Sequence, residues 1–211
     1  MITKSIANLN SLTIVDENSL KTYYGCDQEW YMTDWQRRAG CGPSVVSTII
    51  LYLTRGTLEL GQHINTKENC LALMEEIWEY VTPIKGQGIP TTKMLSEGML
   101  AYTKAKGLHV EYTFCDLSED KSQRPKLSEV LIFLERALSK DAPIAFVNLC
   151  NGEEKDLYRW HWVTIISLTY AETGNSSLFV TILDEGVMKK INLTLWYNTT
   201  TLGGGFVYFT Y

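Results

Sequence analysis

Apolar residues recur at three- and four-residue spacing in four stretches of the chain. In the first stretch, which begins at Pro43, the aliphatic positions fall on one face, and they are Val45, Val46, Ile49, Ile50 and Leu53. This period predicts an amphipathic α-helix that ends near Gly56. The same reasoning predicts three more helices, over residues 66–81, 92–106 and 127–140. Asn65 with Glu68 resembles a capping box at the start of the second.

The pattern changes after Asp141, where short runs rich in β-branched and aromatic residues replace the helical spacing. Such runs are typical of β-strands, and they cover residues 143–150, 160–170, 178–183 and 206–211. An earlier strand is predicted over residues 108–115. Residues 171–177 contain Gly174-Asn175 and are predicted to form a hairpin turn. The first 24 residues show no clear period and are expected to be irregular or to form short extended segments.

The order of these elements predicts the fold class. Helices come first and most strands come later, which indicates an α+β domain with N-terminal helices packed on a C-terminal antiparallel sheet. The length of 211 residues suits one domain with a sizeable core. Since neither an internal repeat nor a linker is evident, we expect residues 1–211 to form a single domain.

Charge and composition exclude several kinds of partner. The net charge is −5 and the chain has no cluster of Lys and Arg, so binding to nucleic acid or to an anionic membrane is not expected. Residues 1–10 do not resemble a signal peptide, and the apolar stretch at residues 45–53 is too short to span a bilayer. We therefore expect a cytoplasmic protein, or a secreted one if a leader has been removed. The oligomeric state is not indicated.

The cysteines favour neither a disulfide framework nor a zinc site. There are five, an odd number, and no Cys-x-x-Cys pair occurs. Cys70, Cys115 and Cys150 are expected to be small buried hydrophobic residues. Histidines are too few for a common metal site, and no Gly-x-Ser-x-Gly or phosphate-binding loop is present. No metal or cofactor is therefore expected.

Cys41 stands apart because of its neighbours. Gly40 and Gly42 flank it and are expected to leave room for a substrate, and Pro43 suits the first turn of a helix. A thiol at a helix N-terminus is favoured as the thiolate, which is the attacking species. The same four residues also fit a plain turn that happens to contain cysteine. Gln36, five residues earlier, is a candidate donor to an oxyanion, with Gln28 as its rival and a solvated surface glutamine as the alternative.

Among the three histidines, His161 is the candidate general base. It follows a polar loop and opens a strongly apolar strand, whereas His63 lies in a polar stretch and His109 opens another strand. Asp184 ends the next predicted strand, so it can approach His161 and orient its imidazole; Glu185 is the alternate carboxylate. The competing interpretations are a packed core histidine and a turn built on Asp184.

These motifs in this order resemble the papain-like cysteine peptidases. They are Gln36, then Cys41-Gly42-Pro43-Ser44, then His161-Trp162-Val163, then Asp184. The closest branch by this resemblance is the bacteriocin-processing peptidase-like family, which acts on double-glycine leaders, and Leu195-Trp196 and the final strand match it too. The resemblance implies a papain-like fold with Cys41 as nucleophile, His161 as base, Asp184 as its orienter and Gln36 as oxyanion donor.

The leading hypothesis is therefore a thiol-dependent peptidase or amidase that hydrolyses a peptide bond in a peptide or protein substrate through an acyl-enzyme. One alternative is a catalytically inactive peptide-binding module of the same fold. Another is a peptidyl transferase, because phytochelatin synthase has a similar cysteine-helix start. The loops at residues 86–90 and 151–159 are predicted to form the walls of the substrate cleft.

Overall fold

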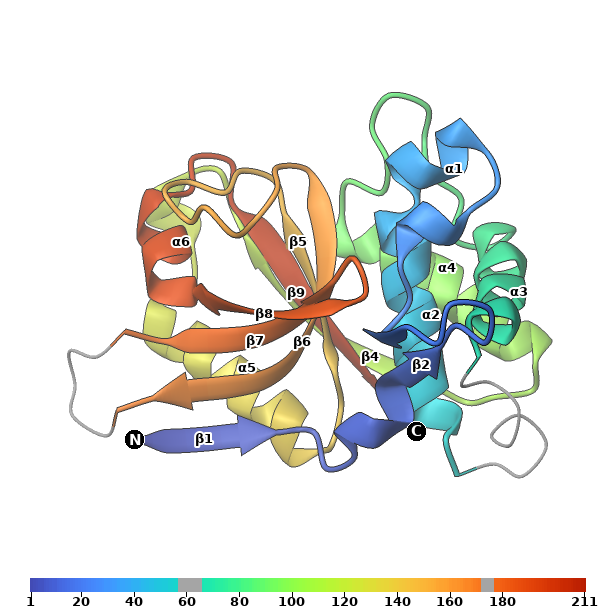
Figure 1. Cartoon of the computed structure of the whole chain (residues 1–211). Helices are drawn as coiled ribbons and strands as arrows, with labels where there is room; N and C mark the ends of the chain where they lie inside the picture. The colour runs from blue at the N-terminus through green and yellow to red at the C-terminus, as the bar shows by residue number, and fades with distance from the viewer. Residues whose placement is uncertain (57–65, 172–176) are drawn as a thin grey trace.

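The computed structural model describes residues 1–56, 66–171 and 177–211. Figure 1 shows two groups of elements side by side, one mainly helical and the other built around a sheet. The helices are α1 (Asp34–Ala39), α2 (Cys41–Thr54), α3 (Lys67–Trp78), α4 (Thr92–Ala105), α5 (Leu127–Ser139) and α6 (Leu193–Thr199). Three short 3-10 helices are η1 (Leu9–Leu12), η2 (Gln28–Trp30) and η3 (Lys121–Gln123).

One antiparallel sheet dominates the second group. Its strands lie in the order β4-β9-β5-β6-β7-β8, and β1 pairs with the far end of β6. Their bounds are β1 Ile2–Ser5, β4 Glu111–Leu117, β5 Ile144–Asn148, β6 His161–Tyr170, β7 Phe179–Asp184, β8 Val187–Asn192 and β9 Gly204–Thr210. A separate two-stranded sheet joins β2 (Thr13–Val15) to β3 (Thr22–Tyr24).

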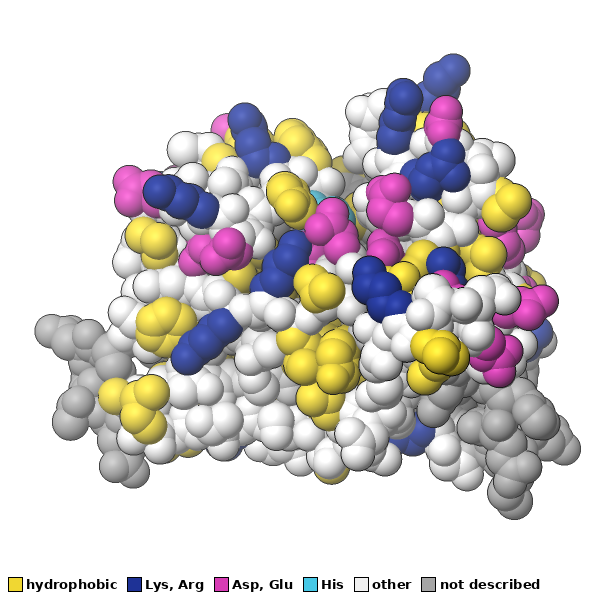
Figure 2. All heavy atoms as spheres, in the orientation of Figure 1, with side chains coloured by type: hydrophobic (Ala, Val, Ile, Leu, Met, Phe, Trp, Pro, Cys, Tyr) yellow, Lys and Arg dark blue, Asp and Glu magenta, His cyan; other side chains and the backbone are white. Residues whose placement is uncertain are grey.

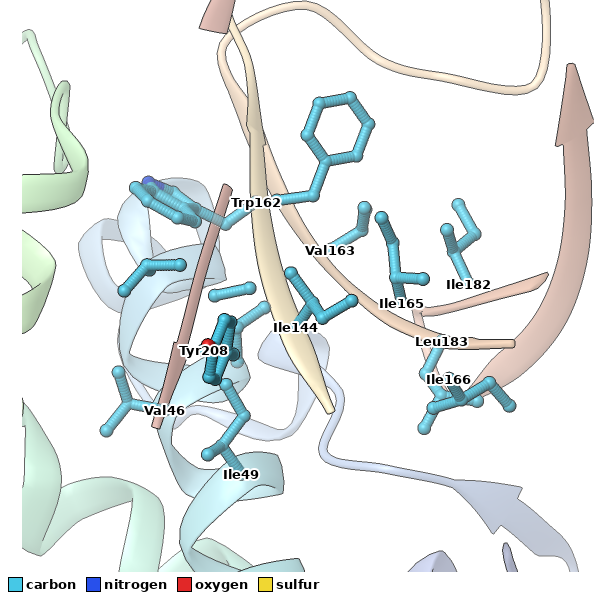
Figure 3. Packing of buried hydrophobic residues seen from close by; sticks show 14 of the residues in the cluster. Val46, Ile49, Ile144, Trp162, Val163, Ile165, Ile166, Ile182, Leu183 and Tyr208 are labelled. Carbon is cyan, nitrogen blue, oxygen red and sulfur yellow. The ribbon is translucent and has the colours of Figure 1, made fainter. Parts of the chain in front are cut away.

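Helix α2 joins the two groups. It is buried on nearly all sides and packs on α3 as well as on β5 and β6. Val46 and Ile49 are fully buried, and Figure 3 shows them beside Tyr208 of β9 and Ile144 of β5. Burial of such a side chain stabilises the fold by about 1.5–3 kcal/mol. The start of α2, where Cys41 lies, is thereby held rigidly against the sheet.

The α+β class is confirmed, because the described residues form helices and an antiparallel sheet in the expected order. All four predicted helices and all five predicted strands occur with end points shifted by a few residues. The sequence reasoning missed α1, α6 and β8, and it did not foresee that residues 2–5 form a strand on β6.

Some expectations fall on residues that the structure leaves undescribed. These include His63, Asn65 and the turn at Gly174-Asn175. The cap of α3 is Thr66, whose side chain accepts a hydrogen bond from the Asn69 N–H. In the part of the chain that is described, no helix combines the length and apolar character needed to cross a membrane.

The cysteines differ from expectation in part. Cys70 is fully buried, but Cys115 and Cys150 are only half-buried. The Cys150 sulfur accepts a hydrogen bond from the Thr201 hydroxyl at 3.2 Å. That bond, together with backbone N–H groups, lowers the pKa of the Cys150 thiol to about 7. Cys150 is therefore a second ionisable thiol and not an inert core residue.

Candidate active site

Cys41 is the first residue of α2, as the glycine-flanked motif predicted. The neighbouring glycines serve packing and not substrate access. A Cβ at Gly40 would lie 2.6 Å from the Tyr31 ring, and one at Gly42 would lie 2.8 Å from the Ile89 side chain. Both positions therefore exclude any larger residue, and the close fit fixes the backbone on either side of the sulfur.

His161 is the first residue of β6, and the residue is buried with 9% exposure. Its Nε2 lies 2.6 Å from Oδ1 of Asp184, and Cys41 lines the same small cavity, close enough for its side chain to raise the pKa of the imidazole. Because Nε2 is taken by the carboxylate, Nδ1 is the nitrogen left for the sulfur. The structure thus brings Cys41 together with His161 and Asp184, which follow it by more than a hundred residues in the sequence.

The electrostatics of this group favour charged forms. Burial lowers the pKa of His161, but the hydrogen bonds and charges of Asp184 and Cys41 outweigh it and raise the pKa to about 10. Burial raises the pKa of Asp184, but the bonds and charges of His161 and Lys189 hold it below its usual value. Opposite charges a few ångströms apart stabilise each other strongly where water is excluded. An imidazolium paired with a carboxylate is therefore the stable state near neutral pH.

Lys189 of β8 is a member of this site that the sequence reasoning missed. Its Nζ lies 2.8 Å from Oδ2 of Asp184 and 3.3 Å from a carboxylate oxygen of Glu185. The ammonium also lies over the ring of Tyr158 at 5.0 Å, and that ring meets the His161 ring edge to face. Both oxygens of Asp184 are thus bonded, one to the imidazole and one to the ammonium.

Glu185 does not take the place of Asp184 beside the imidazole. It bonds to Lys189 and occupies a left-handed conformation with a φ of 52°, followed by Gly186 at 71°. Two such residues form the tight turn between β7 and β8, whose twist suits a hairpin. The turn chemistry noted in the sequence is therefore present, and it coexists with the role of Asp184 as the partner of His161.

The two candidate glutamines lie in different environments. The Gln36 side chain is part of a capping box with Thr33 at the start of α1, and its Nε2 donates to Glu75 at 2.6 Å. Both ends of that amide are engaged away from Cys41, so the expectation that Gln36 donates into the site was wrong. Gln28 of η2 lines a small cavity of about 20 Å³ together with Cys41 and His161. Its buried Oε1 has no hydrogen-bond partner among the described residues.

A larger cleft of about 600 Å³ opens beside Cys41. Figure 2 shows the surface hollowed between the two groups of elements. The cleft is lined by Trp35, Arg38, Ala39, Cys41, Gly86, Gln87, Gly88, Ile89, Pro90, Val147, Leu149, Trp160 and Trp162. Trp162 fixes one wall, because its indole N–H donates to the Ile89 carbonyl at 2.7 Å. The predicted loop at residues 86–90 does line the cleft, whereas residues 151–159 do not.

The residues of this site can therefore support nucleophilic chemistry at sulfur. A half-buried thiol faces a cleft of the size that binds small ligands or peptide segments, and a charged imidazole stands beside it. Within the described residues, no three His, Cys, Asp or Glu side chains gather as metal ligands. No protein-family model matches this chain, and no curated protein is found to match it either.

Proposed function

We propose that this protein is a thiol-dependent peptidase or amidase of papain-like fold. The observation that carries the proposal is that Cys41, His161 and Asp184 line one small cavity, with Nε2 of His161 bonded to Asp184. Nucleophile, base and orienting carboxylate in this relation are the arrangement needed for acyl transfer. The proposed substrate is a peptide or protein segment bound in the cleft beside Cys41.

The reaction begins with the thiolate of Cys41. Its sulfur attacks the carbonyl carbon of the scissile amide and forms a C–S bond. The His161 imidazolium then donates its proton to the departing amine nitrogen as the C–N bond breaks. Water next attacks the thioester while His161 accepts its proton, and the carboxylic acid leaves as the thiolate is regenerated. Asp184 holds the ring orientation and stabilises its positive charge in both steps.

Gln28 is the proposed donor to the oxyanion, in place of Gln36. Gln28 lines the same small cavity as Cys41 and His161, and its buried Oε1 has no hydrogen-bond partner among the described residues. The N–H₂ of the same amide is the proposed donor, since the oxygen can only accept. The backbone N–H of Cys41 at the positive end of α2 is the proposed second donor. Two such donors aimed at one developing charge lower the barrier more than either does alone.

Alkylation of Cys41 tests the proposal. The experiment uses the Cys150→Ser variant, because Cys150 has a pKa of about 7 and would react in parallel. If the proposed chemistry is right, iodoacetamide should modify Cys41 at neutral pH at least about tenfold faster than a free thiol, because His161 and the start of α2 assist the attacking sulfur. His161→Ala should remove that advantage. Equal rates for Cys41 and a free thiol, unaltered by His161→Ala, would refute the proposal.

Product analysis separates the three candidate activities. Incubation with a peptide mixture should release new N-termini in the active protein and none in Cys41→Ser. If products form only when an acceptor amine or thiol peptide is added, the protein is a transferase. If peptides bind with no change in either protein, it is a binding module and the proposed chemistry is wrong.

A further inference from the structure

The cleft beside Cys41 has apolar walls and one charged side chain. Three of its lining residues are tryptophans, Trp35, Trp160 and Trp162, and most of the others are aliphatic residues, proline or glycine. Arg38 is the one ionised side chain, apart from any charge on Cys41 itself, among the described residues that line the cleft. An isolated positive charge beside apolar walls attracts anions more strongly than the same charge in open water.

The charge on Arg38 is not neutralised by the protein. Its neighbour Arg37 is paired with Asp34, and it also donates to the carbonyls of Tyr31 at 2.7 Å and Met32 at 3.1 Å. Arg38 forms no ion pair with any residue in the described part of the chain. Arg37 therefore serves the structure of α1, while the guanidinium of Arg38 remains available at the cleft.

Acidic groups border the other side of Cys41. Asp184 and Glu185 line the small cavity and not the cleft. Burial raises the pKa of nearby Asp27, and the negative charges of Glu29, Glu185 and Asp184 raise it further, so these carboxylates share one neighbourhood. The carboxylates Asp184 and Glu185 are already paired with His161 and Lys189, whereas the positive charge that lines the cleft has no such partner among the described residues.

We infer that the cleft binds an acidic peptide segment. A carboxylate of the segment pairs with Arg38, and a large apolar side chain packs on the tryptophan walls. The planar guanidinium can donate two parallel hydrogen bonds to a carboxylate, which gives direction as well as charge. This inference rests on the proposed peptidase function, and it adds the substrate class that the function leaves open.

Cleavage of a proteome-derived peptide library tests the substrate class. The wild-type protein should cut beside peptide segments enriched in Asp or Glu next to a large apolar residue. Arg38→Gln should lose the acidic enrichment, and Arg38→Glu should replace it with Lys or Arg. Arg37→Gln is the matched control and should retain the wild-type pattern. The same acidic frequency in wild type and Arg38→Glu would overturn the inference while leaving the peptidase function intact.

A second measurement decides the inference even if no peptide is cut. Iodoacetate and iodoacetamide both form a C–S bond at Cys41 and expel iodide, and they differ mainly in charge. With Cys150→Ser as background, Arg38→Gln should lower the ratio of the iodoacetate rate to the iodoacetamide rate several-fold. Arg37→Gln should leave it unaltered. An unaltered ratio in Arg38→Gln would overturn the inference, whereas absent cleavage with a lowered ratio would refute only the peptidase function.

Discussion

Replacing Asp184 with Asn should make folding stability depend much less on pH. Nε2 of His161 donates a buried hydrogen bond to Oδ1 of Asp184, and this bond, together with Cys41, raises the pKa of the imidazole to about 10 from the ordinary 6.5. A group whose pKa is raised on folding stabilises the protein fully below its unfolded pKa. That stabilisation is lost as the pH rises through the folded pKa. The wild-type protein should therefore lose stability between about pH 6.5 and about pH 10.

The size of this effect follows from the two pKa values. Each tenfold change in proton affinity is worth about 1.4 kcal/mol, so the rise from 6.5 to about 10 corresponds to about 5 kcal/mol. Cys41 contributes part of the rise, so Asp184 accounts for only a share of it. Loss of one partner from a buried ion pair typically costs about 3–5 kcal/mol. Near pH 6 the Asp184→Asn variant should thus be less stable than wild type by about 3 kcal/mol.

The difference in stability between wild type and Asp184→Asn should shrink as the pH rises and the His161 imidazole becomes neutral. Asp184 remains charged throughout this window because its pKa is held below the usual value. Near pH 10 only the bond between Asp184 and Lys189 should still separate the proteins, which is worth about 1 kcal/mol for a partly exposed pair. The evidence for the His161–Asp184 pair is therefore that this stability difference decreases with pH, and not how large it is at one pH.

Urea unfolding followed by tryptophan fluorescence measures this gap, since the chain has six tryptophans. The measurements are made under reducing conditions at about pH 6, 8 and 10. Glu185→Gln is the matched control, because Glu185 bonds to Lys189 and not to His161. It should lower stability only slightly, and equally at each pH. A gap between wild type and Asp184→Asn that is the same near pH 6 and pH 10 would refute the reasoning.

Three further outcomes are expected. Gln28→Ala should lower kcat by about 100-fold with little change in KM, whereas Gln36→Ala should keep turnover and cost about 1 kcal/mol of stability through the lost helix cap. Lys189→Met should move the alkaline limit of peptide hydrolysis, where the His161 imidazolium loses its proton, to higher pH, because a positive charge beside Asp184 is removed. Ile49→Ala should cost about 3 kcal/mol in urea unfolding, since this side chain is fully buried in α2.

The elements that could be predicted from sequence are those with a strong local pattern. The aliphatic spacing after Pro43 and the β-branched runs after Asp141 each specify an element without reference to the rest of the chain. The missed elements lack such a pattern. Helix α6 has seven residues, and β8 carries two lysines on a largely exposed strand. Strand β1 has four residues and is stabilised by pairing with β6.

The candidate site likewise has residues that a local sequence pattern predicts and residues whose positions depend on tertiary packing. The position of Cys41 at a helix start is a local property, and the sequence motif was sufficient to predict it. The choice between two glutamines was not local. Gln36 was favoured by its place five residues before Cys41 and by the family resemblance, but its amide completes a capping box with Thr33 and bonds to Glu75 on α3. Gln28 lies near the sulfur because of how η2 packs, which no spacing along the chain reveals.

The pairing register of the sheet explains why Asp184 meets both cations. In the β7–β8 hairpin Asp184 lies opposite Val187, so Lys189 is its diagonal neighbour on the same face. In the β6–β7 pair Leu183 lies opposite Thr164, and one further step sets Asp184 opposite Val163, whose diagonal neighbour is His161. One carboxylate is thus placed between an imidazole and an ammonium by two registers. A slip of one residue in the β6–β7 or the β7–β8 pairing would turn His161 or Lys189 to the opposite face of the sheet from Asp184. The turn at Glu185 and Gly186 fixes the β7–β8 register, and it therefore also determines whether Lys189 pairs with Asp184.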